Sequence, residues 1–240
     1  MRQLVKYALP VGLVAVTRKT REALARRRIE RDRQKRITTY FYEHQVRKLQ
    51  IGSSTNVLEG WLNTDLLPST EEIMFLDATD RFPFEDFTFN YVFSEHMIEH
   101  IEYSKGINML LECFRVLKPG GKIRIATPDL YFMVDLYKSE KTELQGRYIS
   151  WAVDTFLPHI GIHHDTFVIN NFFRSWGHQF IYDFKTLNDA MSRSGFINIA
   201  HYRPGESGDK NLQGIEAHSK WIPDEFNRLE TFVLEGSKPG

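Results

Sequence analysis

The chain has 240 residues, of which 42% are hydrophobic and 26% are charged, and it carries no net charge. This composition provides the core of one globular domain and excludes a wholly disordered chain. The single cysteine, Cys113, excludes an intramolecular disulfide framework and a zinc cluster built from several thiolates. We therefore expect a reducing compartment and predict a cytoplasmic location, with membrane association as an option.

The charge is distributed unevenly along the chain. Residues 1–50 carry 14 Lys and Arg against 4 Asp and Glu, so the rest of the chain is acidic by the same margin. We predict a basic N-terminal arm at 1–47 and a body at 48–240. The apolar run at 4–16 is shorter than the roughly 20 residues that span a bilayer. A solvated helix and a peripheral membrane anchor remain open for the arm, and nucleic-acid binding is the less favoured alternative.

The body alternates strand and helix signals, which are short apolar runs between turn residues and apolar residues at helical spacing. In chain order we predict strands at 48–52, 61–66, 73–77 and 89–94, a helix at 103–117, a strand at 121–129, a helix at 183–196, and strands at 197–203 and 229–236. This order predicts an α/β fold with a doubly wound, mostly parallel seven-stranded sheet. The last two strands predict an antiparallel hairpin at its edge.

Residues 130–182 interrupt this alternation and are rich in aromatic residues and histidine. Ligands of open α/β sheets bind beyond the carboxyl ends of the strands, where an insertion after the fifth strand would lie. We predict a substrate lid here, and a structural cover over the sheet is the alternative.

Five segments carry a resemblance to a known family: QIGSSTN at 50–56, NTD at 63–65, LDA at 76–78, FPFEDFTFNYVFSEHMIEHI at 82–101 and VLKPGGKIRIATPD at 116–129. Together they resemble class I S-adenosylmethionine-dependent methyltransferases, which have a Rossmann-like fold. The chain is most similar to small methyltransferase-domain proteins that accompany glycan and polysaccharide biosynthesis. The resemblance implies S-adenosylmethionine as cofactor.

Residues at the ends of the predicted strands are the candidate cofactor ligands. Gly52 lets the backbone approach a ligand closely, and Asp65 can accept both ribose hydroxyls, as an acidic residue does in dinucleotide sites. The resemblance implies that Asp77 and Ala78 contact the adenine and that Glu95 lies near the transferable methyl group. Turn-forming roles are the alternative for the first three of these residues.

The sequence departs from the family pattern after the first strand. Gln50 stands where an acidic residue is usual, Gly52 is the only glycine of the turn, and twelve residues separate it from Asp65. A parallel crossover with a full helix needs about a dozen residues or more. We therefore expect the first helix to be short or missing.

His96 is the predicted catalytic base, because a neutral imidazole can take the proton of a hydroxyl that attacks the methyl group. His100, one turn later, is expected to be a core histidine. The predicted reaction is O-methylation of a saccharide or another polar, hydroxyl-bearing metabolite. His163, His178 and Tyr182 of the lid are the predicted substrate ligands, with Trp151 and Trp176 as further stacking candidates.

Two other functions stay open. The segment His96-Met97-Ile98-Glu99-His100 fits H-x-x-E-H, a zinc-hydrolase signature with two histidine ligands and a glutamate base. It follows a strand instead of lying within a long helix, so we predict no metal. The reduced glycine turn is also compatible with a non-catalytic methyltransferase-like partner subunit.

Overall fold

The structure is a computed structural model that describes residue 31 and residues 33–240. It divides into two compact units, 1–45 and 46–240. The first unit is helical over residues 33–43. Residues 1–30 and 32, on which most of the predictions for the basic arm rest, lie outside the described residues. Within the described part of the chain, no helix is both long enough and apolar enough to span a bilayer.

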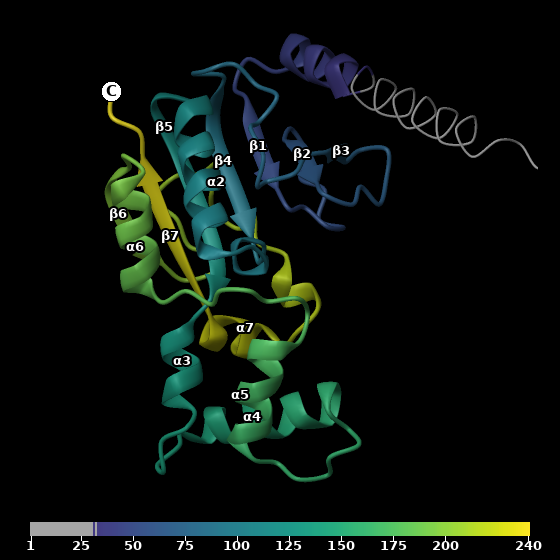
Figure 1. The fold of residues 1–240 in the computed structure, drawn as a ribbon, viewed down its shortest axis with the longest axis vertical. Coiled ribbons are helices and arrows are strands. Elements are labelled where there is room, and N and C mark those ends of the chain that lie inside the picture. The colour runs from purple at the N-terminus through teal and green to yellow at the C-terminus, as the bar shows by residue number, and fades with distance from the viewer. Residues whose placement is uncertain (1–30, 32) are drawn as a thin grey trace, which may run out of the picture. The chain divides into compact units, whose positions relative to one another are not determined.

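The second unit is built on a seven-stranded sheet (Figure 1). Its strands are β1 (Lys48–Ile51), β2 (Leu62–Asp65), β3 (Met74–Phe75), β4 (Phe89–Glu95), β5 (Leu117–Pro128), β6 (Ile197–Tyr202) and β7 (Thr231–Ser237). They are ordered β3-β2-β1-β4-β5-β7-β6, and β7 alone runs antiparallel to both of its neighbours. The predicted fold class is confirmed. The antiparallel pair is not a tight hairpin, because residues 203–230 connect its strands and include η2 (His218–Lys220) and α7 (Asp224–Glu230).

The first four strands are joined without helices. Among the described residues, those between β1 and β2, between β2 and β3 and between β3 and β4 form only turns, bends and irregular loops. The prediction of a missing first helix is therefore confirmed, and the next two connections lack one as well. The face of the sheet that crossover helices would cover must be closed by another part of the chain.

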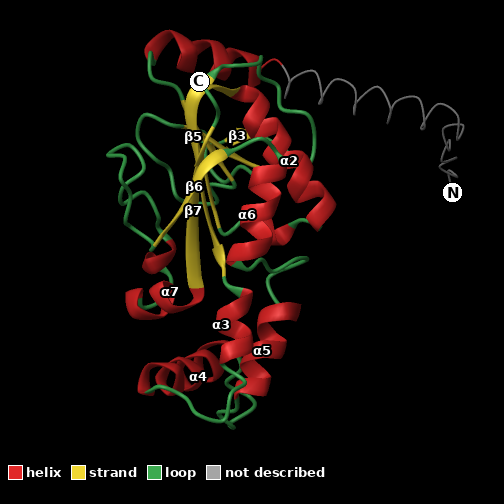
Figure 2. Cartoon of the chain, turned by 90° about the vertical axis from the view of Figure 1, so that its left-hand side faces the viewer, coloured by secondary structure: helices red, strands yellow, loops and turns green. Residues whose placement is uncertain are grey.

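Helices cover one face of the sheet, as Figure 2 shows for α2 (Tyr103–Val116) and α6 (Phe184–Arg193). Their buried sides are apolar and include Leu110 and Met191, both fully buried. Cys113 is buried on the same side of α2, and burial raises the pKa of its thiol. It is therefore a packing residue and not a reactive thiol. Between them these helices cover β5, β7 and β6.

A loop, residues 203–217, covers the opposite face. Alternate strand residues point to it, because successive side chains of a strand lie on opposite faces. Lys122 donates to the Asp209 carboxylate over 2.9 Å, and the fully buried Arg124 pairs with Glu216 of the loop and with Glu235 of β7. A small apolar cluster of Trp61, Phe93 and Leu212 completes the contact.

The predicted lid is a helical subdomain of α3 (Leu130–Asp135), α4 (Glu143–Phe156) and α5 (Asp165–Arg174). Figure 1 shows it beyond the carboxyl ends of the parallel strands. It has its own apolar core, to which Tyr148, Phe172 and Phe226 contribute, the last of them from α7. Thr142 begins α4 with a capping box, in which its hydroxyl accepts from the Gln145 amide. The lid thus has a core of its own, continuous with α7.

Candidate functional site

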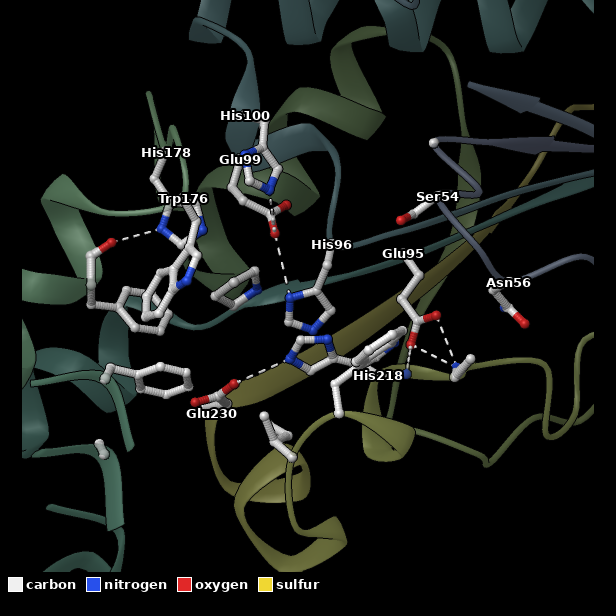
Figure 3. Close-up of a pocket in the computed structure, with 18 of the residues that line it drawn as sticks. Ser54, Asn56, Glu95, His96, Glu99, His100, Trp176, His178, His218 and Glu230 are labelled. Atoms are coloured by element: carbon white, nitrogen blue, oxygen red, sulfur yellow. Dashed lines mark hydrogen bonds and ion pairs between the residues drawn. The ribbon is translucent and has the colours of Figure 1, made fainter. Parts of the chain in front are cut away.

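One cavity of about 510 Å³ lies between the strand ends and the lid. Its sheet side is formed by the turn after β1, residues 52–56, and by Glu95 and His96 at the end of β4. Its lid side is largely aromatic and includes Trp151 and Trp176. Residues 217–222, which follow the loop over the sheet, contribute to a third side. Figure 3 shows the polar side chains between these parts.

The turn after β1 brings backbone to the cavity wall. Gly52 has φ of +72°, and a Cβ on this residue would lie 2.7 Å from Cβ of Met97. A side chain is therefore excluded by both conformation and space. Next to it, Gln50 and Ser53 are almost fully buried, and among the described residues the Gln50 Oε1 and the Ser53 Oγ have no hydrogen-bond partner. Buried polar atoms without partners are costly, so this turn is suited to a polar ligand.

Asp65 and Asp77 have structural partners. The Asp65 carboxylate accepts from the backbone amides of Ser54 and Leu67, each over 2.8 Å, and Asp77 accepts from the amide and hydroxyl of Thr79. Neither carboxylate lines the cavity, and Ala78, which is buried, does not line it either. The structure shows turn-forming roles for both carboxylates, and cofactor contacts at Asp65, Asp77 and Ala78 stay predictions.

Glu95 lines the cavity and also holds its third side in place. Its carboxylate accepts from the backbone amides of Ala217 and His218 over 2.9–3.0 Å. These residues follow the loop that closes the second face of the sheet. The carboxylate therefore links the end of β4 to a segment more than 120 residues away.

His96 lies in a stacked pair of imidazoles. Its ring is 3.7 Å from that of His218, with an interplanar angle of 15°. The His96 backbone has φ of +45°, a left-handed conformation that is uncommon outside glycine and is found at functional sites. Its Nε2 lies 3.0 Å from the Thr231 hydroxyl and its Nδ1 lies 3.4 Å from the Glu99 carboxylate. Both ring nitrogens thus face polar partners.

Carboxylates surround the stacked pair. Burial alone would lower the pKa of His96, but the interaction with Glu99 and the charges of Glu230 and Glu95 outweigh it, so the pKa is raised. The Nε2 of His218 lies 3.6 Å from the Glu230 carboxylate, which also accepts from the Tyr148 hydroxyl. An imidazole oriented by a carboxylate is a common arrangement for proton transfer. His218, Glu230 and Tyr148 were not predicted from the sequence.

The predicted lid ligands divide. His178 lines the cavity, and so do Trp151 and Trp176. His163 is absent from the lining and pairs with Asp154 on the surface over 2.7 Å. The prediction for Tyr182 is not supported, because this side chain is fully buried and its hydroxyl lies against Gly106 of α2.

Comparison with protein-family models gives one match. Residues 54–125 match a family model described as a methyltransferase domain. This match confirms the predicted methyltransferase domain over the segment that it covers. No curated protein matches the chain. The glycan acceptor stays a prediction.

Several solved structures resemble the chain loosely. An S-adenosylmethionine-dependent methyltransferase of Archaeoglobus fulgidus is 15% identical, with a TM-score of 0.48 over 86% of this chain and 91% of that one. A complex between a Haloferax volcanii methyltransferase and the activator Trm112 is 15% identical, with a TM-score of 0.45 over 85% of this chain and 89% of that one. Phosphoethanolamine N-methyltransferase 2 of Haemonchus contortus, in complex with S-adenosylmethionine, is 15% identical, with a TM-score of 0.41 over 81% of this chain and 49% of that one. The chain thus spans about half the length of the Haemonchus enzyme.

Proposed function

We propose that this methyltransferase transfers the methyl group of S-adenosylmethionine to a hydroxyl of a saccharide or a similar polar metabolite. The observation that carries the proposal is that one continuous cavity joins the turn at Gly52 to the aromatic lid and has the stacked His96 and His218 between them. Such a cavity can hold a donor and an acceptor side by side. Alignment of the two reactants supplies a large part of the acceleration in a displacement of this kind.

The turn after β1 is the part of the cavity that fits the donor. Bound S-adenosylmethionine supplies an electrophilic methyl group on a sulfonium cation. The unpartnered Gln50 Oε1 and Ser53 Oγ are suited to bind polar groups of its amino-acid portion. The Glu95 carboxylate places a negative charge in the cavity wall, which favours a cation nearby. Gly52 has no side chain, and a Cβ here would collide with Met97, so glycine is the residue that lets this backbone form the cavity wall.

The imidazole pair is the part of the cavity that is suited to take the proton of the acceptor's hydroxyl. The Thr231 hydroxyl donates to the side-chain Oδ1 of Asn227, so its own oxygen accepts from Nε2 of His96. The lone pair of neutral His96 then lies on Nδ1, where an added proton faces Glu99. We therefore retain His96 as the general base, and His218, oriented by Glu230, is its neighbour in proton transfer. The flat faces of Trp151 and Trp176 in the lid are suited to stack on a sugar ring.

The test is transfer of a labelled methyl group from S-adenosylmethionine to a panel of nucleotide sugars and glycans. We expect His96→Gln to lower turnover by about 10²–10⁴-fold, the usual contribution of a general base, and to leave the binding of S-adenosylhomocysteine unchanged. His163→Gln, on the surface of the lid, is the matched control and should retain full activity. Equal activity of the two variants would contradict a catalytic role for His96.

A further inference from the structure

A second cluster of polar side chains lies at the edge of the cavity, beside the imidazole pair. Glu99 and His100 belong to η1 (Ile98–His100), directly after β4, and His178 follows the lid helix α5. Each offers one ligand atom, and the three atoms lie within 4.8 Å of one another. Figure 3 shows the three side chains gathered on one side of His96.

The two segments that supply the cluster are fastened to each other. The backbone amides of Gln179 and Phe180 both donate to the Glu99 carbonyl, over 2.8 and 3.1 Å. The Gln179 side-chain amide donates to the His100 carbonyl over 2.7 Å. These hydrogen bonds fix the backbone of η1 relative to the backbone next to His178, although His100 and Gln179 are 79 positions apart in the sequence. The Cα positions of the three cluster residues are therefore held close together. The site is organised before any ligand binds.

The Glu99 carboxylate is unusual because it is fully buried and only half satisfied. Its Oε2 accepts from the Thr127 hydroxyl over 3.0 Å, whereas its Oε1 makes no hydrogen bond among the described residues. The nearest basic atoms are Nδ1 of His96 at 3.4 Å and Nε2 of His100 at 4.0 Å. A buried carboxylate is costly unless opposite charge and hydrogen bonds compensate it. The Oε1 atom is therefore available to a cation.

His178 is prepared as a ligand in a specific tautomer. Its Nδ1 lies 2.6 Å from the Phe172 carbonyl oxygen, which can only accept, so Nδ1 carries the hydrogen. The neutral ring then presents its lone pair on Nε2. Histidines that bind metals usually donate their second ring N–H to a carbonyl or carboxylate in this way.

We propose that Glu99, His100 and His178 bind a divalent first-row transition metal ion, with Zn²⁺ as the representative case. Two imidazoles and one carboxylate form a donor set that Zn²⁺ uses in catalytic sites and that Ca²⁺ and Mg²⁺ do not favour. Ligand atoms around tetrahedral zinc, with bonds of about 2.1 Å, lie about 3.4 Å apart. The side chains must therefore move together by about 1 Å when the ion binds.

This set differs from the one that the H-x-x-E-H pattern predicts. In that pattern both histidines bind the metal and the glutamate is the base. Here His96 turns toward Thr231 and His218, and the lid residue His178 takes its place beside Glu99 and His100. Catalytic zinc is usually four-coordinate, so these three ligands would leave one position for a further ligand. If the proposed function is correct, this position would hold the acceptor's hydroxyl oxygen and promote loss of its proton.

The experiment uses the full chain, freed of metal with a chelator and dialysed. Titration with Co²⁺ monitored by its visible absorption, and with Zn²⁺ by calorimetry, should show one equivalent bound. His178→Ala and Glu99→Gln should weaken binding by about 100-fold or more, because outer partners of such ligands alone account for 10–100-fold. His163→Ala removes a surface histidine of the same lid and should bind as the unmodified chain does.

The outcomes separate the metal site from the proposed function. Absence of stoichiometric metal, or equal affinity in the His178 and His163 variants, would overturn the site. His100→Ala, at a side chain that is 36% exposed, serves if either of the other two variants fails to fold. Titration of the same samples with S-adenosylhomocysteine tests the methyltransferase independently. Cofactor binding without metal would leave the methyltransferase in place and reject the metal site, and metal without cofactor binding would do the reverse.

Discussion

The two faces of the sheet are closed in different ways. On one face, α2 and α6 bury apolar residues such as Leu110 and Met191 against the strands. On the other face, the loop at 203–217 is fastened by ion pairs of Arg124 and Lys122. The second arrangement follows from the missing helices between the first strands. It also brings Ala217 and His218 to Glu95, so the loop-covered face builds part of the cavity.

The largest expected effect is on the buried ion pair under the loop. Arg124→Met removes a fully buried cation and leaves the Glu216 and Glu235 carboxylates without it. Such a loss costs about 3–5 kcal/mol in the free energy of unfolding, which urea denaturation would measure. Arg228→Met, at an exposed pair with Asp224 on α7, is the control and should change stability by less than about 0.5 kcal/mol. Equal losses in the two variants would show that the loop is not held by Arg124.

The helix-covered face should respond to loss of volume. Leu110→Ala removes a fully buried side chain of α2 and should cost about 3 kcal/mol. Its neighbour Leu111 is 46% exposed, so Leu111→Ala should cost far less. Binding of S-adenosylhomocysteine distinguishes the faces, because Leu110→Ala should retain it and Arg124→Met should weaken it. Full binding of S-adenosylhomocysteine by folded Leu110→Ala and folded Arg124→Met alike would contradict this difference between the two faces.

A smaller and pH-dependent effect is expected at the far end of the loop. Burial alone would raise the pKa of Asp209, but hydrogen bonds from Lys122 and Asn211 outweigh it and lower the pKa to about 2, from an ordinary value of 3.8. A carboxyl group with a depressed pKa stabilises the fold above its ordinary value, and this contribution disappears as the pH falls from about 4 to about 2. Asp209→Asn should therefore cost about 1–2 kcal/mol at pH 6.

Urea denaturation of the Asp209→Asn variant and the unmodified chain at pH 6 and at pH 3 checks this effect. The difference in stability between the two proteins should shrink at the lower pH. A difference that is the same at both values would assign the loss to packing instead of charge.

The same contrast explains what could be predicted from the sequence. The helices and strands of the helix-covered face follow apolar spacing, and their bounds agree with the prediction within a few residues, as for α2. Gly52, Glu95 and His96 could be placed because each lies at the end of a strand or directly after it. The loop at 203–217 has no periodic pattern of apolar residues, so its contacts with Arg124 and Glu95 could not be predicted from the sequence.

The remaining site residues depend on contacts between distant parts of the chain. His218 reaches His96 because the loop crosses the sheet, and Glu230 reaches His218 at the end of α7. Single residues of common types that lie far from their partners in the sequence, as His218 lies 122 positions from His96, cannot be recognised by spacing. Tyr182, an aromatic residue at the end of the lid, was predicted to face substrate, and its side chain lies buried against α2.

The most direct measurement of the central claim is calorimetric titration of the full chain with S-adenosylhomocysteine, together with two glycine variants. Gly52 and Gly60 have similar φ, +72° and +75°, but only Gly52 lies in the cavity wall against Met97. We predict binding by the unmodified chain and by Gly60→Ala, and a loss of affinity of about 10-fold or more, at least 1.4 kcal/mol, in Gly52→Ala. No binding to the unmodified chain, or equal affinity in the two variants, would contradict a cofactor site at this turn.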